Sequence, residues 1–341
     1  MIDSREIPRS LTEPLRGLGE AASPYQVYGS IYRSFVAPRL DPLALGSAIK
    51  TKFSCLLYGP PGTGKTTIAQ MLARALGWSL IIITPSDFVV SGEAEVESRA
   101  KAIFDVLQLQ TDVVIFLDEI DRLLLDRDSA DYQKQSDMFQ FMTPSMLTKL
   151  NDLRGRRRSI FVIATNYADR IDNAITRPGR IDAQYLVLPP DAAQRTRLLT
   201  HLAGARPPLR DINPKDVQAA VNSTALYTRT EMRRLAELAE ELIVVEDVKP
   251  GDALLTAASR LSASIKLGTY MTKVANAGSN VPSTLLEELF LLAYLTVEVD
   301  GLQSALSGDD DRKLGYYWQE YKAVVRDERI KGRLDEALSR P

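Results

Sequence analysis

The feature that most constrains the fold is the octapeptide GPPGTGKT at residues 59–66, which follows an apolar stretch and precedes a segment of helical periodicity. It fits the pattern G-x-x-x-x-G-K-[ST], in which backbone N–H groups surround the phosphates of a nucleotide. Glycines let the backbone approach a ligand closely, and a helix that begins near Lys65 would add its free N–H groups and positive dipole end. FSCLL at 53–57 predicts a strand, and TTIAQMLARAL at 66–76 predicts a helix. The sequence therefore predicts an α/β fold with a phosphate-binding loop.

The side chains of this loop have separate expected roles. Lys65 would reach the β- and γ-phosphates, and Thr66 would hold Mg²⁺. The expected cofactors are therefore ATP and Mg²⁺. The predicted nucleotide-binding residues of the loop are Gly59, Pro60, Pro61, Gly62, Thr63, Gly64, Lys65, Thr66 and Thr67.

A second apolar strand is predicted at 113–117, where the sequence reads VVIFL and is followed by Asp118 and Glu119. Open α/β sheets bind ligands at the carboxyl ends of their strands. Asp118 would hold Mg²⁺ through water, and Glu119 would orient and polarise the attacking water. An acid-rich helix N-terminus would explain the same residues without any catalytic role.

A third strand, SIFVIATN at 159–166, ends in the polar residue Asn166, and TRPGR follows at 176–180. Arg177 and Arg180 could form a solvated face. Alternatively they are arginine fingers that reach the nucleotide of a neighbouring subunit, since they lie too close in sequence to the preceding strand to fold back on the same γ-phosphate.

Composition narrows the class of protein. The chain has 341 residues, of which 45% are hydrophobic and 25% charged, with a formal net charge of −2. This composition is ordinary for a globular protein, and the small net charge gives no overall electrostatic attraction to nucleic acid or to an anionic membrane. Residues 1–20 are charged and have no apolar core of a signal peptide, and no apolar run is long enough to span a bilayer. The only cysteine, Cys55, fits a reducing compartment and a buried position in the first strand. We therefore expect a cytoplasmic protein with no membrane partner.

Taken together, these motifs resemble the AAA+ ATPases, and most of all their classical AAA clade. The resemblance covers about residues 25–265 and rests on YGPPGTGKTT, FLDEIDRLLLDR, IATNYADRIDNAITRPGRID and the proline pair of LVLPPD. It implies a P-loop core, a helical lid, a homo-oligomeric ring, commonly a hexamer, and ATP bound between subunits.

The resemblance also implies roles for particular residues. Asn166 falls on the sensor of the γ-phosphate, and Arg177 and Arg180 fall on the paired arginines that act in trans. With Glu119 these form the expected catalytic set. Tyr28 and Gly29 lie in SPYQVYGSI, which resembles the stretch that brackets the adenine, and Arg127 falls on the arginine that closes the segment after the acidic strand.

Three stretches depart from the clade or leave alternatives open. In TKLNDL, at 148–153, Asn151 and Asp152 stand where the clade has aspartate and glycine. The segment from 86, SDFVVSGEAEVE, lacks the aromatic of a protein-threading pore loop; its nearest aromatic, Phe88, is expected at a strand end, in the core or in the pore. Arg229 could act as a second sensor, and His201 is expected on a helix surface or near the adenine or ribose.

The rest of the chain is predicted to be helical. Thr228 and Glu231 form a capping box for a helix with one apolar stripe, which belongs to the lid. RGRRRS at 154–159 is expected to be a solvated loop, or a basic collar of a central pore. The expected division is an N-terminal arm at 1–24, the α/β nucleotide-binding domain at 25–190, the lid at 191–268 and a helical extension at 269–341.

The expected activity is ATP hydrolysis by a ring that remodels a macromolecular partner, expected to be a protein. Two alternatives stay open. The ring could be a nucleotide-controlled scaffold or regulator of an effector such as a protease or nuclease, or it could be a motor associated with nucleic acid.

Overall fold

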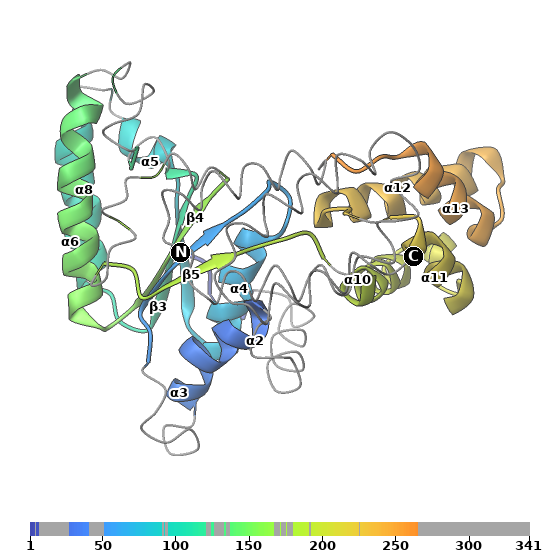
Figure 1. The fold of residues 1–341 in the computed structure, drawn as a ribbon, viewed down its shortest axis with the longest axis horizontal. Helices are drawn as coiled ribbons and strands as arrows, with labels where there is room; N and C mark the ends of the chain where they lie inside the picture. Colours follow the sequence, from blue (N-terminus) through green and yellow to red (C-terminus); the bar gives the residue numbers. More distant parts are fainter. Residues whose placement is uncertain are drawn as a thin grey trace, which may run out of the picture. The chain divides into compact units, whose positions relative to one another are not determined.

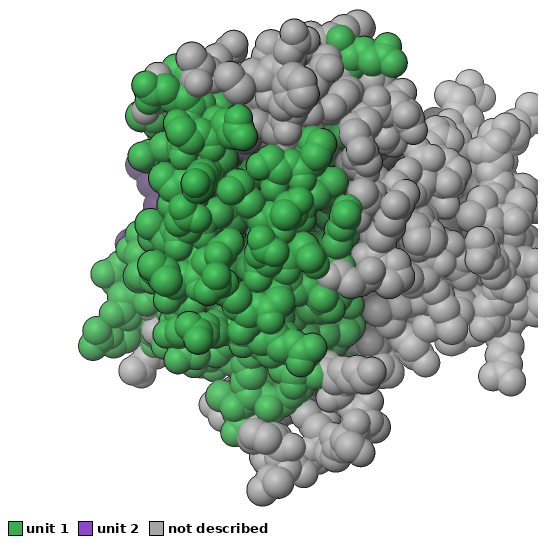
Figure 2. All heavy atoms as spheres, turned by 90° about the vertical axis from the view of Figure 1, so that its left-hand side faces the viewer, with its two compact units in different colours: residues 1–59, 65–187, 280–282 green, residues 60–64, 188–279, 283–341 purple. Residues whose placement is uncertain are grey.

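The computed structural model describes residues 1–3, 5–6, 27–40, 51–90, 92, 95–120, 124–125, 133, 137–166, 171, 175, 180–190, 192–224 and 226–264. The chain divides into two compact units. Unit 1 comprises residues 1–59, 65–187 and 280–282, and unit 2 comprises residues 60–64, 188–279 and 283–341. Figure 2 shows one face of unit 1 in green.

Unit 1 is built on a parallel sheet in which five strands follow the order β2-β3-β4-β1-β5. The strands are β1 Ser54–Tyr58, β2 Ser79–Ile83, β3 Val113–Asp118, β4 Ile160–Thr165 and β5 Ala183–Leu186. All of β1 and β4 and the first five residues of β3 are buried, which explains their continuous apolar sequences. The predicted α/β class with a parallel sheet is confirmed.

The register of the sheet brings the ends of three strands together. Tyr58 pairs with Thr165, and Asp118 pairs with Ala164. The segments that follow β1, β3 and β4 therefore start at the same side of the sheet, where the strands have their carboxyl ends. The polar residues that the sequence analysis predicts to be functional lie at these ends.

Helices cover both faces of this sheet (Figure 1). On one face, α6 (Val96–Leu109) and α8 (Asp137–Arg156) run side by side. On the other face lie α4 (Lys65–Leu76) and a continuous helical segment. This segment consists of α2 Val27–Ile31, the π-helical η2 Tyr32–Val36 and α3 Ala37–Leu40. A further short helix, α5, spans Pro85–Val89.

The edge strand β2 carries an additional pairing partner. The backbone N–H of Ile2 donates to the carbonyl of Leu80, and the N–H of Leu80 donates to the carbonyl of Ile2, both at 2.8 Å. The two residues form an isolated antiparallel bridge. The first residues of the chain thus cover part of an otherwise open sheet edge.

Asp182 joins three segments of unit 1. One carboxylate oxygen accepts from the backbone N–H groups of Phe53 and Ser54 at 2.8 and 3.1 Å. The other accepts from Nε and a terminal nitrogen of Arg154 at 2.8 and 2.6 Å. Burial raises the pKa of Asp182, but the hydrogen bonds from Arg154 and Phe53 outweigh it, and the net pKa lies below its ordinary value. Asp182 therefore fixes the start of β1 against the end of α8.

Unit 2 is helical over its described residues beyond the loop 60–64. Its helices are α10 Ala192–Gly204, the 3-10 helix η6 Pro207–Leu209, α11 Pro214–Asn222, α12 Arg229–Glu246 and α13 Pro250–Arg260. The predicted capping box is confirmed, because Thr228 Oγ1 accepts from the N–H of Glu231 at 3.2 Å and Glu231 Oε2 accepts from the N–H of Thr228 at 2.6 Å.

The predicted apolar stripe of α12 is also confirmed. Its members all lie in the core of unit 2, and they are Met232, Leu235, Ala236, Ala239 and Leu242. The expected helical extension at 269–341 lies outside the described residues. Within the described part of the chain, no helix combines the length and apolar character needed to cross a membrane.

Candidate active site

The loop after β1 has the backbone conformation that its glycines predict. Gly59, Gly62 and Gly64 have φ of 143°, 77° and 98°. A Cβ on Gly59 would lie 2.3 Å from the carbonyl oxygen of Val187, so only glycine fits there. α4 begins at Lys65, so the free N–H groups of its first turn follow the loop directly. This is the arrangement expected of a phosphate cradle.

The tip of the loop, residues 60–64, belongs to unit 2. The N–H of Arg229 donates to the carbonyl of Gly62 at 3.0 Å. A Cβ on Gly64 would lie 2.6 Å from Cδ of Arg229, so this glycine permits a close approach of the arginine side chain. The capping box at Thr228 fixes Arg229 as the first residue of α12, and this is the sequence signal that predicts its position.

Unit 1 brings five of the predicted polar side chains together in two hydrogen-bonded groups. Lys65 is only 8% exposed, and its Nζ donates to the carbonyl of Gly59 at 2.9 Å and to Oδ1 of Asn166 at 2.7 Å. Nδ2 of Asn166 donates to Oε1 of Glu119 at 3.3 Å. In the second group, Thr66 Oγ1 donates to Oδ2 of Asp118 at 3.4 Å. Residues separated by about a hundred positions in sequence thus meet at the carboxyl edge of the sheet.

The electrostatics of this cluster favour a bound cation. The pKa of Asp118 is raised, chiefly because burial disfavours its charged form and secondly because of the charge of Glu119. The charge of Lys65 and the hydrogen bond from Thr66 oppose this shift. Two adjacent acids therefore stand beside one ammonium group, and a divalent cation would relieve their repulsion.

Glu119 has a backbone conformation that is uncommon for its residue type. It follows β3 with a φ of 53°, and its N–H donates to the carbonyl of Ala164 at 3.2 Å. Residues held in such regions tend to occur at functional sites. The exposed carboxylate is thereby held at the sheet edge, beside Asn166.

The residues present fit Mg²⁺ with a triphosphate. Among the described residues, no group of three or more His, Cys, Asp and Glu side chains could hold a metal ion. Magnesium is commonly bound through one or two protein oxygens, waters and the phosphates of the substrate. The neighbouring oxygens of Thr66 and Asp118 can act as such ligands, and the buried ammonium of Lys65 can bind the phosphates.

The structure describes four other predicted site residues, and two lie outside the described residues. Tyr28 and Gly29, predicted beside the adenine, are buried in the short helix α2. Thr67 lies half-buried in the first turn of α4. Arg180 lies half-buried in the turn before β5, whereas Arg177 lies outside the described residues. The predicted Arg127 likewise falls among residues that the structure does not describe.

The segment after β2 settles one open alternative. Phe88 was expected at a strand end, but β2 ends at Ile83 and Phe88 lies fully buried in α5. A capping box of Thr84 and Asp87 ends the strand and starts this helix. Val90, which follows α5, is 72% exposed. Val89 is also exposed, at 37%, so exposed aliphatic side chains stand at the end of this helix, whereas Phe88 belongs to the core.

The remaining candidates lie on helix surfaces or in the sheet. His201 is exposed on α10, and Asn151 and Asp152 are exposed on α8. Cys55 is buried in β1, and burial raises the pKa of its thiol, so the predicted packing role is confirmed. Sequence reasoning missed Asp182, because its partners lie far from it along the chain.

Comparison with known proteins identifies residues 55–188 as a match to the family model described as "ATPase family associated with various cellular activities (AAA)". Protein SAV of Sulfolobus acidocaldarius is 29% identical over 239 residues, which are 69% of this chain and 30% of that protein. ATP-dependent zinc metalloprotease FtsH 2 of Symbiobacterium thermophilum is 33% identical over 191 residues, which are 55% of this chain and 32% of that protein.

A cell division cycle protein 48 homolog of Archaeoglobus fulgidus is 30% identical over 204 residues, or 60% of this chain and 27% of that protein. The chain thus spans about 30% of the length of these curated relatives. Among solved structures, the FIGL-1 AAA domain in complex with ADP has the same fold, with a TM-score of 0.59 and 22% identity. That match covers 74% of this chain and 86% of the FIGL-1 chain.

Proposed function

We propose that this chain, whose residues 55–188 match the model of the AAA family of ATPases, binds Mg-ATP on the loop 59–66 and hydrolyses it. The observation that carries this proposal is the hydrogen-bonded series from Lys65 through Asn166 to Glu119, with Thr66 and Asp118 paired beside it. A buried lysine at a helix start, two acids at the end of a strand and an amide after the next strand are groups that phosphoryl transfer uses.

The proposed roles follow from this placement. Lys65 would bind phosphate oxygens at the positive end of α4, and Asn166 would orient towards the γ-phosphate. Glu119 would position a water and draw its proton away as the water attacks phosphorus. Thr66 and Asp118 would hold Mg²⁺, which would supply positive charge to the phosphate oxygens during the reaction.

The second half of the proposed site comes from another copy of this chain. Arg177 and Arg180 follow β4 and precede β5, and we assign them to the nucleotide of a neighbouring subunit. There they would stabilise negative charge in the transition state. The proposed assembly is a homo-oligomeric ring, in which hydrolysis alters the contacts between neighbouring subunits.

We propose that this cycle remodels a macromolecular partner, with a protein as the favoured class. FtsH 2 of Symbiobacterium thermophilum is named as an ATP-dependent zinc metalloprotease, so an AAA segment similar to this one accompanies proteolysis there. The exposed Val90 provides an aliphatic rather than an aromatic contact for a polypeptide. The alternative is a nucleotide-controlled regulator that positions an effector, with slow hydrolysis as its timer.

Capture with a Glu119→Gln variant tests the proposal. This variant should retain ATP and hydrolyse it at least about 100-fold more slowly, since the general base is lost. A partner that stays bound with ATP and leaves with ADP supports an ATP-controlled assembly, and Lys65→Ala, which should not bind ATP, is the negative control. ATPase activity that rises with an unfolded polypeptide favours the remodeller. Unchanged hydrolysis by Glu119→Gln would refute the catalytic assignment.

A further inference from the structure

A pocket of unit 1 lies at the amino ends of the strands. Asp118 and the predicted nucleotide site lie at the opposite, carboxyl ends of the strands. The volume of the pocket is about 580 Å³, within the range of small-molecule sites. Four of its nine lining residues lie just before strands: Phe53 before β1, Trp78 before β2, Asp112 before β3 and Arg158 near β4. Since β3 has six residues, the length of the strand, about 17 Å, separates this pocket from Asp118.

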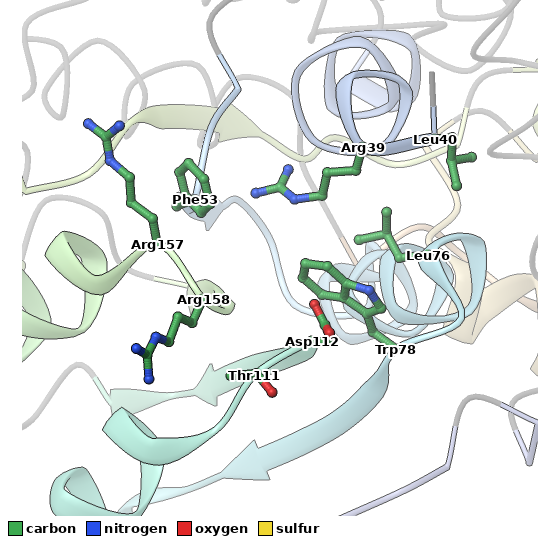
Figure 3. A pocket seen from close by; sticks show the side chains of 9 residues that line it. All are labelled: Arg39, Leu40, Phe53, Leu76, Trp78, Thr111, Asp112, Arg157 and Arg158. Carbon is green, nitrogen blue, oxygen red and sulfur yellow. The ribbon is translucent and has the colours of Figure 1, made fainter. Parts of the chain in front are cut away.

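The lining combines aromatic rings with guanidinium groups (Figure 3). Cζ of Arg39 lies 4.6 Å from the ring centre of Phe53 and 5.5 Å from that of Trp78. Cζ of Arg157 lies 5.9 Å from the ring centre of Phe53. In Figure 3 the guanidinium of Arg39 points towards Phe53 and lies near Trp78. These distances are those of cation–π pairs.

Charge in the pocket is unbalanced. Arg39, Arg157 and Arg158 line it, with Asp112 as the only acid among the lining residues. Burial lowers the pKa of Arg39 to about 10, with the charge of Asp182 opposing the shift. An anion bound beside Arg39 would offset this cost of burial.

The frame of the pocket is fixed by hydrogen bonds. Arg39 donates to the carbonyl oxygens of Phe35 and Lys52 at 2.6 and 2.8 Å, so its guanidinium is held in place. The N–H of Asp112 donates to the carbonyl of Arg158 at 3.0 Å. Sites that are held by such bonds bind with less loss of conformational freedom.

We propose that this pocket binds a nucleotide unit, with its base against the Arg39 guanidinium and Trp78 and its phosphate on Arg157 and Arg158. Aromatic and guanidinium planes stack on bases, and arginine pairs with phosphate. The carboxylate of Asp112 favours a base over an acidic peptide. It would repel a second carboxylate, but it can accept a hydrogen bond from the exocyclic amine of a base such as cytosine. The unit is either a free mononucleotide or part of a single strand.

The test is fluorescence anisotropy with a labelled, short single-stranded oligodeoxycytidine. Arg157→Glu and Arg158→Glu should each weaken binding at least about five-fold, a loss comparable to that of one stacked base. Arg156→Glu is the matched control, because Arg156 is a neighbour that is also exposed but does not line the pocket. Equal losses in all three variants would show diffuse attraction and overturn the proposal, as would the absence of binding at low salt.

Trp78 gives a second readout that does not depend on these arginines. The chain has two tryptophans, Trp78 and Trp318, so a Trp318→Phe variant isolates the emission of Trp78. Oligodeoxycytidine should quench this emission, and unchanged emission at saturation would overturn the stacking. A polyglutamate peptide that competes as well as the oligonucleotide would also overturn the proposal, in favour of a general anion site.

Two further experiments distinguish a free nucleotide from a strand, and this pocket from the loop 59–66. Cytidine monophosphate that displaces the oligonucleotide shows that a free nucleotide suffices; displacement by unlabelled oligonucleotide alone assigns the ligand to a strand. In Lys65→Ala, oligonucleotide binding should be unchanged, because Lys65 begins α4 at the other edge of the sheet. Loss of binding in this variant would place the ligand on the loop 59–66 and refute its assignment to this pocket.

Discussion

Nζ of Lys65 donates a hydrogen bond of 2.7 Å to Oδ1 of Asn166, which links the first residue of α4 to the residue that follows β4. The same lysine is almost completely buried and also binds the carbonyl of Gly59. The proposed phosphate-binding lysine and the proposed γ-phosphate sensor are therefore joined by a direct hydrogen bond. Substitutions at either position test this coupling.

Lys65→Ala should abolish ATP binding, since it removes the only side-chain cation of the loop 59–66. It should also lower the melting temperature, because the buried carbonyl of Gly59 and the half-buried Oδ1 of Asn166 lose their donor. Calorimetric titration and thermal unfolding measure the two effects. Lys101→Ala, at an exposed position on α6, is the control. Retained affinity for ATP would contradict the assignment of the cradle.

Asn166→Ala should leave ATP binding nearly intact and slow hydrolysis by about 100-fold, the usual effect of removing one transition-state donor. The amide also donates to Glu119 at 3.3 Å, so its loss frees the proposed base to move. Single-turnover rates at saturating ATP separate this effect from binding. A variant with weak binding and a normal rate would reassign Asn166 to ground-state binding.

Arg180→Ala should bind ATP and fail to hydrolyse it if the arginine serves a neighbouring subunit. Mixing it with Glu119→Gln should restore part of the activity, because some interfaces then combine an intact Glu119 with an intact Arg180. Steady-state ATPase of mixtures at varied ratios is the measurement. A mixture no more active than its components, although mass spectrometry shows mixed assemblies, would argue against a shared site.

Gly59→Ala should destabilise the protein strongly or prevent folding. The new Cβ would meet the carbonyl oxygen of Val187 at 2.3 Å, and the φ of 143° is strained for alanine. Gly155→Ala is the matched control, because no atom lies within 4 Å of the added Cβ and the position is helical. This control should stabilise the protein by about 0.5–1 kcal/mol. Denaturant unfolding of both variants distinguishes the two cases.

Asp182→Asn should lower stability at neutral pH, since the bonds to Arg154 and Phe53 lose their charged acceptor. The pKa of Asp182 is lowered in the folded state, so its stabilisation is fully present above the ordinary value of 3.8. It is lost as pH falls through the lower, folded pKa. The free energy of unfolding should therefore fall more steeply below about pH 4 in the parent than in the variant. Parallel curves would disprove this linkage.

The sheet and the polar cluster could largely be predicted from the sequence, because both follow from local pattern. β3 and β4 are continuous apolar runs, and their ends place Asp118 and Asn166 at one edge through the register of parallel strands. The start of α4 at Lys65 follows from the glycines before it. Each of these inferences uses the sequence of a single segment, together with the rule that the carboxyl ends of parallel strands lie at the same side of the sheet.

Other features depend on contacts between distant segments and could not be predicted. Asp182 gives no local signal, because its partners at 53–54 and 154 become neighbours only in the folded unit. The capping box after β2 decides that Phe88 is helical and buried, and this was not recognised from the sequence. The roles of Arg177 and Arg180 stay predictions, since they require a second copy of the chain.

The backbone pairing of Ile2 with Leu80 has a practical consequence for handling the protein. Removing the first three residues, or rigidly fusing a tag at this point, would leave the N–H and C=O of Leu80 on the rim of the sheet without their present partner. Uncovered rims recruit strands from other molecules. Preparations truncated in this way should form particles on storage sooner, while those labelled at a surface loop should stay monodisperse.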